Sequence, residues 1–122
     1  MTRDNKELAA FGEQFAKDYL KKSGMKFLEQ NYRCTLGEID LIFRDKDALV
    51  FVEVKLRQNR YFGPAALAVS LSKQKKIIKT AQVYLREKQL RDLFIRFDVV
   101  GVEMEKEQWI CKHYRNAFLA EE

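Results

Sequence analysis

The sequence predicts an α/β fold in which a mixed central sheet is flanked by helices. Apolar residues recur with helical spacing in two segments and with a period of two in five others. The second helical segment separates the third and fourth strand segments, so it would form a crossover that leaves these two strands parallel. The other strands follow one another through short links, which favour antiparallel pairing. The predicted order is α-β-β-β-α-β-β, within a single domain that spans residues 1–122.

The two helices are expected at residues 6–22 and 72–88. Asp4 and Glu7 have the spacing of a capping box at the start of the first helix. In the second segment, Ser72 precedes an apolar stripe and is the expected N-cap. Both segments therefore carry a recognisable start signal.

Five strand candidates are bounded by turn-forming or charged residues. On the second of them, Ile39, Leu41 and Phe43 should share one face of the sheet, with Asp40 on the opposite face. The strands are expected at residues 28–34, 38–44, 48–56, 94–102 and 108–114.

The charge balance and the cysteine content restrict the functional classes. Lys and Arg total 23 against 18 Asp and Glu, which gives a formal net charge of +5, a pI near 9.2 and a tendency to bind polyanions. No long apolar run is present, so no membrane segment is expected. Cys34 and Cys111 lack CxxC spacing and His113 is the only histidine, so neither a disulfide framework nor a zinc site is expected. These features predict a cytoplasmic protein with reduced cysteines.

Three charged residues inside apolar strands are the strongest functional candidates, because a buried charge is costly and usually persists for a function. Glu53 and Lys55 lie on the same face of the third strand by the period of two. If the chain turns near Lys46, residues whose numbers sum to about 92 or 93 face each other, which brings Asp40 beside Glu53. Two adjacent carboxylates repel each other unless a cation neutralises them. Hard oxygen ligands of this kind are those that Mg²⁺ binds.

An exposed charge network on a solvated sheet face is the simpler explanation for Glu53 and Lys55. It is weakened because Phe51 shares their face and because a second carboxylate joins the cluster. Asp98 interrupts the fourth strand in a similar way. Arg96 on its own face could pair with it, which favours a structural role for Asp98.

Each helix adds one polar candidate. Glu13 lies on a stripe of small apolar residues with Ala16, next to Gly12, whose lack of a side chain permits close approach to the sheet. Gln74 precedes Ile78 by four residues and therefore faces inward at the start of the second helix. The simpler explanation for Glu13 is a side chain that bends towards water, and for Gln74 an ordinary amide at the edge of the core.

A basic segment with aromatic residues leads out of the third strand and continues on the second helix. Its cations suit phosphate contacts, and its rings suit stacking on bases. The alternative is a solvated charged surface in which the aromatic residues only anchor the loop. It explains any single residue as well as DNA binding does, but it explains the whole group less well. The residues assigned to DNA binding are Arg57, Arg60, Tyr61, Lys73 and Lys76.

Five motifs, in order along the chain, resemble the YraN family of bacterial proteins. They are Gly12-Glu13, GEIDLI at 37–42, FVEVK at 51–55, RFDVV at 96–100 and NAF at 116–118. Five separated motifs in register are far more specific than one short pattern. That family is similar to the PD-(D/E)xK nuclease superfamily, which includes archaeal Holliday-junction resolvases and restriction endonucleases. The resemblance implies a restriction-endonuclease-like fold.

The resemblance also implies the chemistry of the site. Asp40 and Glu53 would bind Mg²⁺ or Mn²⁺ together with the backbone carbonyl of Val54, and Lys55 would position the attacking water. Ile39 replaces the proline of the motif's name without removing a ligand. The implied catalytic set is Glu13, Asp40, Glu53, Lys55 and Gln74, in which Glu13 lies beside the metal or binds a second one and Gln74 is a looser match.

The expected function is that of a metal-dependent endonuclease that hydrolyses DNA phosphodiester bonds, with branched or recombination DNA as one candidate substrate. A homodimer is expected where two strands are cut, with the apolar segment 64–71 as a candidate contact, unless that segment packs on its own core. The main alternative is a non-catalytic DNA-binding protein on the same scaffold, acting in recombination or DNA uptake. A general α/β interaction domain is the third reading, and cleavage with divalent metal separates the first from the other two.

Overall fold

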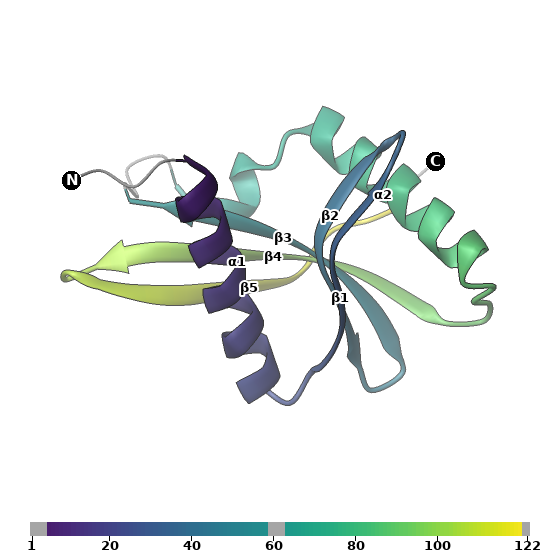
Figure 1. The fold of residues 1–122 in the computed structure, drawn as a ribbon, viewed down its shortest axis with the longest axis horizontal. Coiled ribbons are helices and arrows are strands. Elements are labelled where there is room, and N and C mark those ends of the chain that lie inside the picture. Colours follow the sequence, from purple (N-terminus) through teal and green to yellow (C-terminus); the bar gives the residue numbers. More distant parts are fainter. Residues whose placement is uncertain (1–4, 59–62, 121–122) are drawn as a thin grey trace.

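The structure, a computed structural model, describes residues 5–58 and 63–120 (Figure 1). Two residues assigned above to DNA binding, Arg60 and Tyr61, lie outside the described residues, as does Asp4. Within the described ranges the structure confirms the predicted order α-β-β-β-α-β-β, with one short 3₁₀ helix in addition. The elements are α1 (Asn5–Lys22), β1 (Lys26–Cys34), β2 (Gly37–Asp45), β3 (Ala48–Arg57), η1 (Ala65–Ala68), α2 (Leu71–Glu87), β4 (Phe94–Glu105) and β5 (Gln108–Phe118).

The five strands form one mixed sheet in the order β1-β2-β3-β4-β5. Strands β3 and β4 pair in parallel, because η1 and α2 return the chain to the same end of the sheet, and the other neighbours pair antiparallel. The predicted mixed sheet is therefore confirmed. None of the described helices has the length and hydropathy needed to span a bilayer.

The helices cover opposite faces of this sheet, so both faces of β3 are buried (Figure 1). On one face, Leu20 of α1 packs with Val50 and Val52. On the other, Ile77 of α2 packs with Phe51. A strand that is covered on both sides must be almost wholly apolar, which makes any charged residue in it costly.

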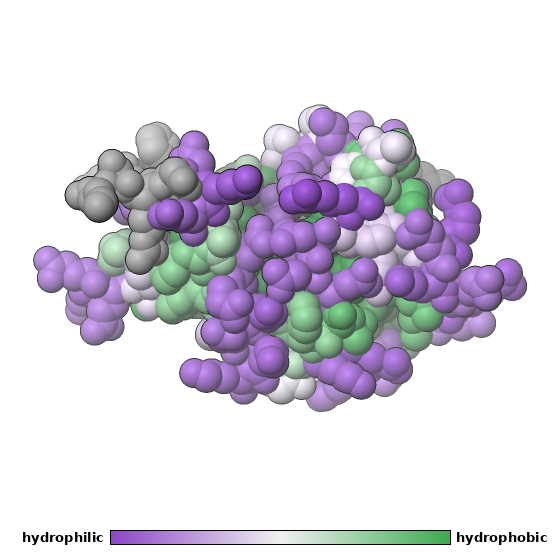
Figure 2. All heavy atoms as spheres, viewed as in Figure 1, coloured by the Kyte–Doolittle hydropathy of each residue, from purple (hydrophilic) through white to green (hydrophobic). Residues whose placement is uncertain are grey.

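Seen from the α1 side, hydrophilic side chains cover most of the surface, and a hydrophobic patch lies beside the β4–β5 hairpin (Figure 2). The ring of Trp109, at the start of β5, lies 5.3 Å from the ring of Phe11 on α1, and both pack against the α1-side core. This core therefore extends towards the β4–β5 hairpin.

The start of α2 differs from the prediction. Its N-cap is Ser70 and not Ser72, because the Ser70 hydroxyl accepts a hydrogen bond from the Lys73 backbone N–H at 3.1 Å. Both serines have suitable side chains, but the buried Val69 anchors the preceding turn in the core, so the helix begins directly after it. The first turn of α2 is thereby set against β3.

The alternation predicted for β2 is wrong at one residue. Ile39 packs with Ile42 in the core under α2, whereas Leu41 packs under α1. The register places Asn31 of β1 opposite Asp40, and Asn31 has a left-handed φ of 53°. The regular pleat is thus disturbed at Asp40, the functional candidate in this strand.

The segment 64–71 packs largely on its own core. Ala65 and Val69 are buried in the core under α2, as the simpler interpretation of this segment requires. Leu67 and Leu71 instead point outward, and their relative exposures are 78% and 72%. These two leucines are the large apolar side chains of the segment that remain exposed.

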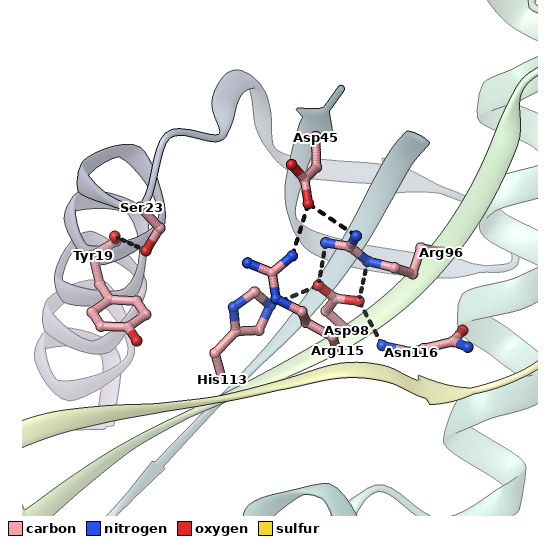
Figure 3. A network of polar contacts seen from close by, with 8 residues as sticks. All are labelled: Tyr19, Ser23, Asp45, Arg96, Asp98, His113, Arg115 and Asn116. Atoms are coloured by element: carbon pink, nitrogen blue, oxygen red, sulfur yellow. Dashed lines mark hydrogen bonds and ion pairs between the residues drawn. The ribbon is translucent and has the colours of Figure 1, made fainter. Parts of the chain in front are cut away.

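Asp98 is fully buried on β4 and is surrounded by hydrogen-bond donors (Figure 3). Arg96 binds both of its oxygens, at 2.9 and 3.0 Å, which confirms the predicted pairing. Burial alone would raise the pKa of Asp98, but hydrogen bonds from His113 and Arg96 lower it below its ordinary value. The Asp98 network consists of Asp45, Arg96, Asp98, His113, Arg115 and the backbone N–H of Asn116.

Candidate active site

A cleft of about 680 Å³ opens between the first half of α1, the strands β2 and β3, and the first turn of α2. It is the place where the charged residues of the two apolar strands come together. The ionisable residues among those that line it are Glu13, Glu38, Asp40, Glu53, Arg57 and Lys73. Helix α1 supplies Glu13, and Gly12 allows its close approach, because a Cβ at Gly12 would lie 3.1 Å from Leu56 Cδ1 on β3.

Asp40 is held by the backbone of the neighbouring strand. The β2–β3 ladder pairs Leu41 with Val52, so the residue numbers sum to 93, as expected, and Asp40 comes next to Glu53. The Asp40 side chain then accepts a hydrogen bond from the Val54 N–H at 2.8 Å. A carboxylate fixed by a backbone donor has a defined position and needs little reorganisation to bind a ligand.

Glu53 is the centre of the charge cluster, with a relative exposure of only 6%. The ammonium groups of Lys55 and Lys73 each lie 3.8 Å from its Oε2 atom. Burial and the neighbouring charge of Asp40 raise the pKa of Glu53 to about 8, although both lysines act to lower it. Burial also raises the pKa of Asp40. Both shifts favour protonation of the pair, as expected for two neighbouring carboxylates that are removed from water.

The donor set suits a hard divalent cation. Asp40 and Glu53 present carboxylate oxygens in a polar cleft, and their raised pKa values indicate that the lysines alone do not neutralise the pair. Among the described residues, no group of three or more His, Cys, Asp or Glu side chains has the spacing to hold a metal ion. Two carboxylates are nevertheless the number through which proteins usually bind Mg²⁺, with waters and substrate phosphate as the remaining ligands.

Glu13 faces the same cleft from α1. Its pKa is raised by burial and by the charge of Asp40, and a hydrogen bond with the Asn31 side chain opposes this shift. Glu13 therefore lies near the carboxylate pair, as predicted. Its hydrogen-bond partner is the side chain of Asn31, the residue with the left-handed φ.

Gln74 does not line the cleft. Its side-chain amide donates to the Val69 carbonyl at 3.0 Å and so closes the turn before α2. From the same helical turn, Lys73 contacts Glu53 instead. The sequence predicted only a DNA-binding role for Lys73. The available signal was the position of Lys73 four residues before the buried Ile77.

The described DNA-binding candidates line either the cleft or a hollow beside it. Arg57 lines it and donates to the Gly63 carbonyl. Lys76 lines a second hollow, of about 410 Å³, between the β1–β2 turn and α2, and Lys73 and Glu38 line both hollows. The two hollows therefore adjoin each other at Lys73.

Replacing Glu53 by Gln should stabilise the fold at neutral and alkaline pH. Between its ordinary pKa of 4.5 and about 8, the folded protein binds this proton more tightly than the unfolded chain, so wild-type stability falls as pH rises through this range. The advantage of Glu53→Gln should be absent near pH 4, grow through this range and level off above about pH 8, since each pKa unit corresponds to about 1.4 kcal/mol. Urea denaturation at several pH values measures it. Glu107→Gln, in the exposed β4–β5 turn, should show no such trend, and an equal trend in both variants would contradict the assignment.

Comparisons with known proteins place these residues in a family. The profile of the uncharacterised protein family UPF0102 matches residues 12–102, a span that includes the residues of the cleft from Gly12 onward. A UPF0102 protein of Clostridium botulinum (strain Loch Maree / Type A3) is 44% identical over 117 residues, which cover 93% of this chain and 95% of the relative. A UPF0102 protein of Syntrophus aciditrophicus (strain SB) is 45% identical over 114 residues, which cover 93% and 90%.

Proposed function

This chain belongs to the uncharacterised protein family UPF0102, the family of the YraN resemblance, and we propose that it is a metal-dependent nuclease that hydrolyses DNA phosphodiester bonds. The observation that carries the proposal is the Asp40–Glu53 pair, which lies on neighbouring strands in an open cleft. Glu53 is buried, and the Lys55 ammonium lies 3.8 Å from its Oε2 atom. The resemblance to PD-(D/E)xK nucleases supports the same chemistry for the same residues. Branched or recombination DNA is the proposed substrate class.

Mg²⁺ or Mn²⁺ is the proposed cofactor, with Asp40, Glu53 and the Val54 carbonyl as its ligands. A metal bound there would polarise the phosphate and lower the pKa of an attacking water. The Val54 N–H that holds Asp40 would keep this ligand in place during the reaction. The raised pKa of Glu53 means that it must lose its proton before it can bind a metal, so cleavage should increase with pH through the neutral range.

The remaining groups of the cleft would orient the reactants. Lys55 lies on the same strand face as Glu53 and would hold the attacking water by a hydrogen bond. Glu13 reaches the cleft from α1 and would accept a hydrogen bond from water on the side of Asp40. Arg57 at the mouth would contact a phosphate away from the cut.

A panel of branched, flapped, nicked and linear DNAs, incubated with Mn²⁺ or with EDTA, tests the proposal. We expect Mn²⁺-dependent cleavage of at least one substrate and none in EDTA. A protein that retards these DNAs in gels without cutting any of them would be a binding protein, and the nuclease proposal would fail.

Removing cations around the cleft should weaken DNA binding and reduce its salt dependence. For the double variant Arg57→Ala/Lys76→Ala, the slope of log K against log salt should fall by about 0.9 for each phosphate that the protein no longer neutralises. Binding is measured without divalent metal by fluorescence anisotropy over a salt series. The matched control, Lys21→Ala/Lys22→Ala at the far end of α1, removes the same charge and should leave the slope unchanged. Equal slopes for both double variants would show that only net charge matters.

We further propose that a homodimer forms where both strands are cut, because two identical sites related by a two-fold axis provide two cuts. Leu67 and Leu71 are the described apolar residues of segment 64–71 that could form the contact. Light scattering with and without junction DNA should detect the dimer, and Leu67→Lys should reduce its population. Paired cuts by a protein that stays monomeric on the DNA would overturn this expectation.

A further inference from the structure

Glu53 is contacted by two lysines, although the nuclease motif accounts for only one. Lys55 approaches Oε2 from β3 itself, and Lys73 approaches the same oxygen from the first turn of α2, each at 3.8 Å. Their side-chain exposures are similar, at 32% and 38%. Of the two, Lys73 lines the cleft itself, so it can contact both the buried carboxylate and a ligand in the cleft.

The backbone fixes the position from which Lys73 reaches the site. Its N–H donates to the Ser70 hydroxyl, and the Gln74 side chain closes the same turn on Val69. Val69 is buried, so this turn cannot shift without disturbing the core. The position of Lys73 is therefore as well defined as a position on the sheet.

Lys73 also stands where the two hollows meet. One of these holds the carboxylates, and the other lies between the β1–β2 turn and α2 and is lined by Arg33 and Lys76. A nucleic-acid strand that runs from the basic hollow to the carboxylates must pass Lys73 immediately before it reaches Glu53.

We propose that Lys73 is a second catalytic lysine of this site, which holds Glu53 together with Lys55 and donates to a non-bridging oxygen of the scissile phosphate. This inference rests on the proposed nuclease function. Its physical basis is that a fixed cation beside a phosphate stabilises the charge that develops during hydrolysis, and that it does so best in a site shielded from water. Lys76, one turn further along α2, lines only the basic hollow and is assigned to strand binding.

The test compares Lys73→Gln with Lys79→Gln, a matched loss of one charge from the same helix at an exposed residue that lines neither hollow. Single-turnover cleavage at saturating DNA should be roughly 100-fold slower in Lys73→Gln and within about 3-fold of wild type in Lys79→Gln. Lys73→Arg, which keeps the charge, should recover most of the rate. A wild-type single-turnover rate in Lys73→Gln would overturn the proposal.

A second measurement does not depend on cleavage. Mn²⁺ binding without DNA, followed by electron paramagnetic resonance of the free ion, should be several-fold tighter in Lys73→Gln, because one positive charge beside the carboxylates is gone. It should be unchanged in Lys79→Gln. If the wild-type protein cuts none of the DNAs, the nuclease proposal fails by itself. Unchanged Mn²⁺ affinity in a folded Lys73→Gln protein would then reject the role of Lys73 at the carboxylate pair.

Discussion

Glu53→Gln should reduce metal-dependent cleavage by about 10³-fold or more while the protein remains folded. The substitution keeps the shape of the side chain but removes a charged oxygen from the proposed metal site, and losing several kcal/mol of transition-state stabilisation corresponds to this factor. Because Glu53 is buried beside Asp40, the neutral amide should also raise stability at neutral pH. Loss of activity can then not be attributed to unfolding. Single-turnover cleavage and a thermal melt on the same preparation measure both effects.

Asp40→Asn and Lys55→Gln should have comparable effects on the rate, because each removes a different part of the same cluster. The control is Glu38→Gln. Glu38 lines the same cleft but is half-exposed and ion-paired with Arg33 at 3.1 Å, so its loss should change the rate by less than about 3-fold. Cleavage by Glu53→Gln at the wild-type rate would remove the central assignment, and an equal loss in Glu38→Gln would mean that only the charge of the cleft matters.

The adjacency of Asp40 and Glu53 could be predicted because it depends on local geometry alone. A two-residue turn at Lys46-Asp47 sets the register of the β2–β3 hairpin, and the period of two then assigns every face of β3. Glu13 could be predicted because Gly12 marks the place where α1 approaches the sheet. These inferences need no knowledge of how distant segments pack.

The errors arose where tertiary packing decides between local alternatives. Ser70 and Ser72 are equally good N-caps by residue type, and the burial of Val69 selects the first. The Ser70 cap places both Lys73 and Gln74 within the first turn, and Lys73 lies one turn before the buried Ile77 on the same side of the helix. Lys73 therefore reaches Glu53, and Gln74 binds the preceding loop.

The face of the sheet on which Ile39 lies could not be predicted from the sequence either. The distortion of β1 at Asn31 interrupts the regular pleat opposite Asp40, and asparagine is only one of many residues that can adopt a left-handed φ. Asn31 in turn provides a partner for Glu13. Such a link between three elements cannot be read from the spacing within any one of them.

The Asp98 network illustrates the same limit. The pairing of Arg96 with Asp98 follows from their spacing of two along β4, and it was predicted. Asp45 and Arg115 join through contacts that span 51 and 70 residues of sequence, so only the folded sheet reveals them (Figure 3). The network links the β2–β3 turn to β4 and β5, and its loss should therefore affect the whole sheet.

Asp98→Ala should destabilise the protein by about 3–5 kcal/mol, the largest effect on stability expected of any single substitution here. Asp98 is fully buried, and its removal leaves Arg96, His113 and the Asn116 N–H without their shared acceptor. Breaking a buried ion pair on one side costs this amount because the remaining charge has no partner in the core. Urea denaturation at pH 7 measures the loss. Arg115→Ala is the control, because Arg115 is 53% exposed and should contribute less than about 1 kcal/mol.

The pH dependence gives a second and independent check of the same network. The folded-state pKa of Asp98 is lowered, so its contribution is complete above the ordinary value of 3.8 and is lost as pH falls through the folded pKa. The stability gap between wild type and Asp98→Ala should therefore be constant from pH 5 to 7 and should narrow only in strong acid. A gap below 1 kcal/mol at pH 7 would mean that water can replace Asp98 as the acceptor, and the network would then contribute specificity of strand pairing rather than stability.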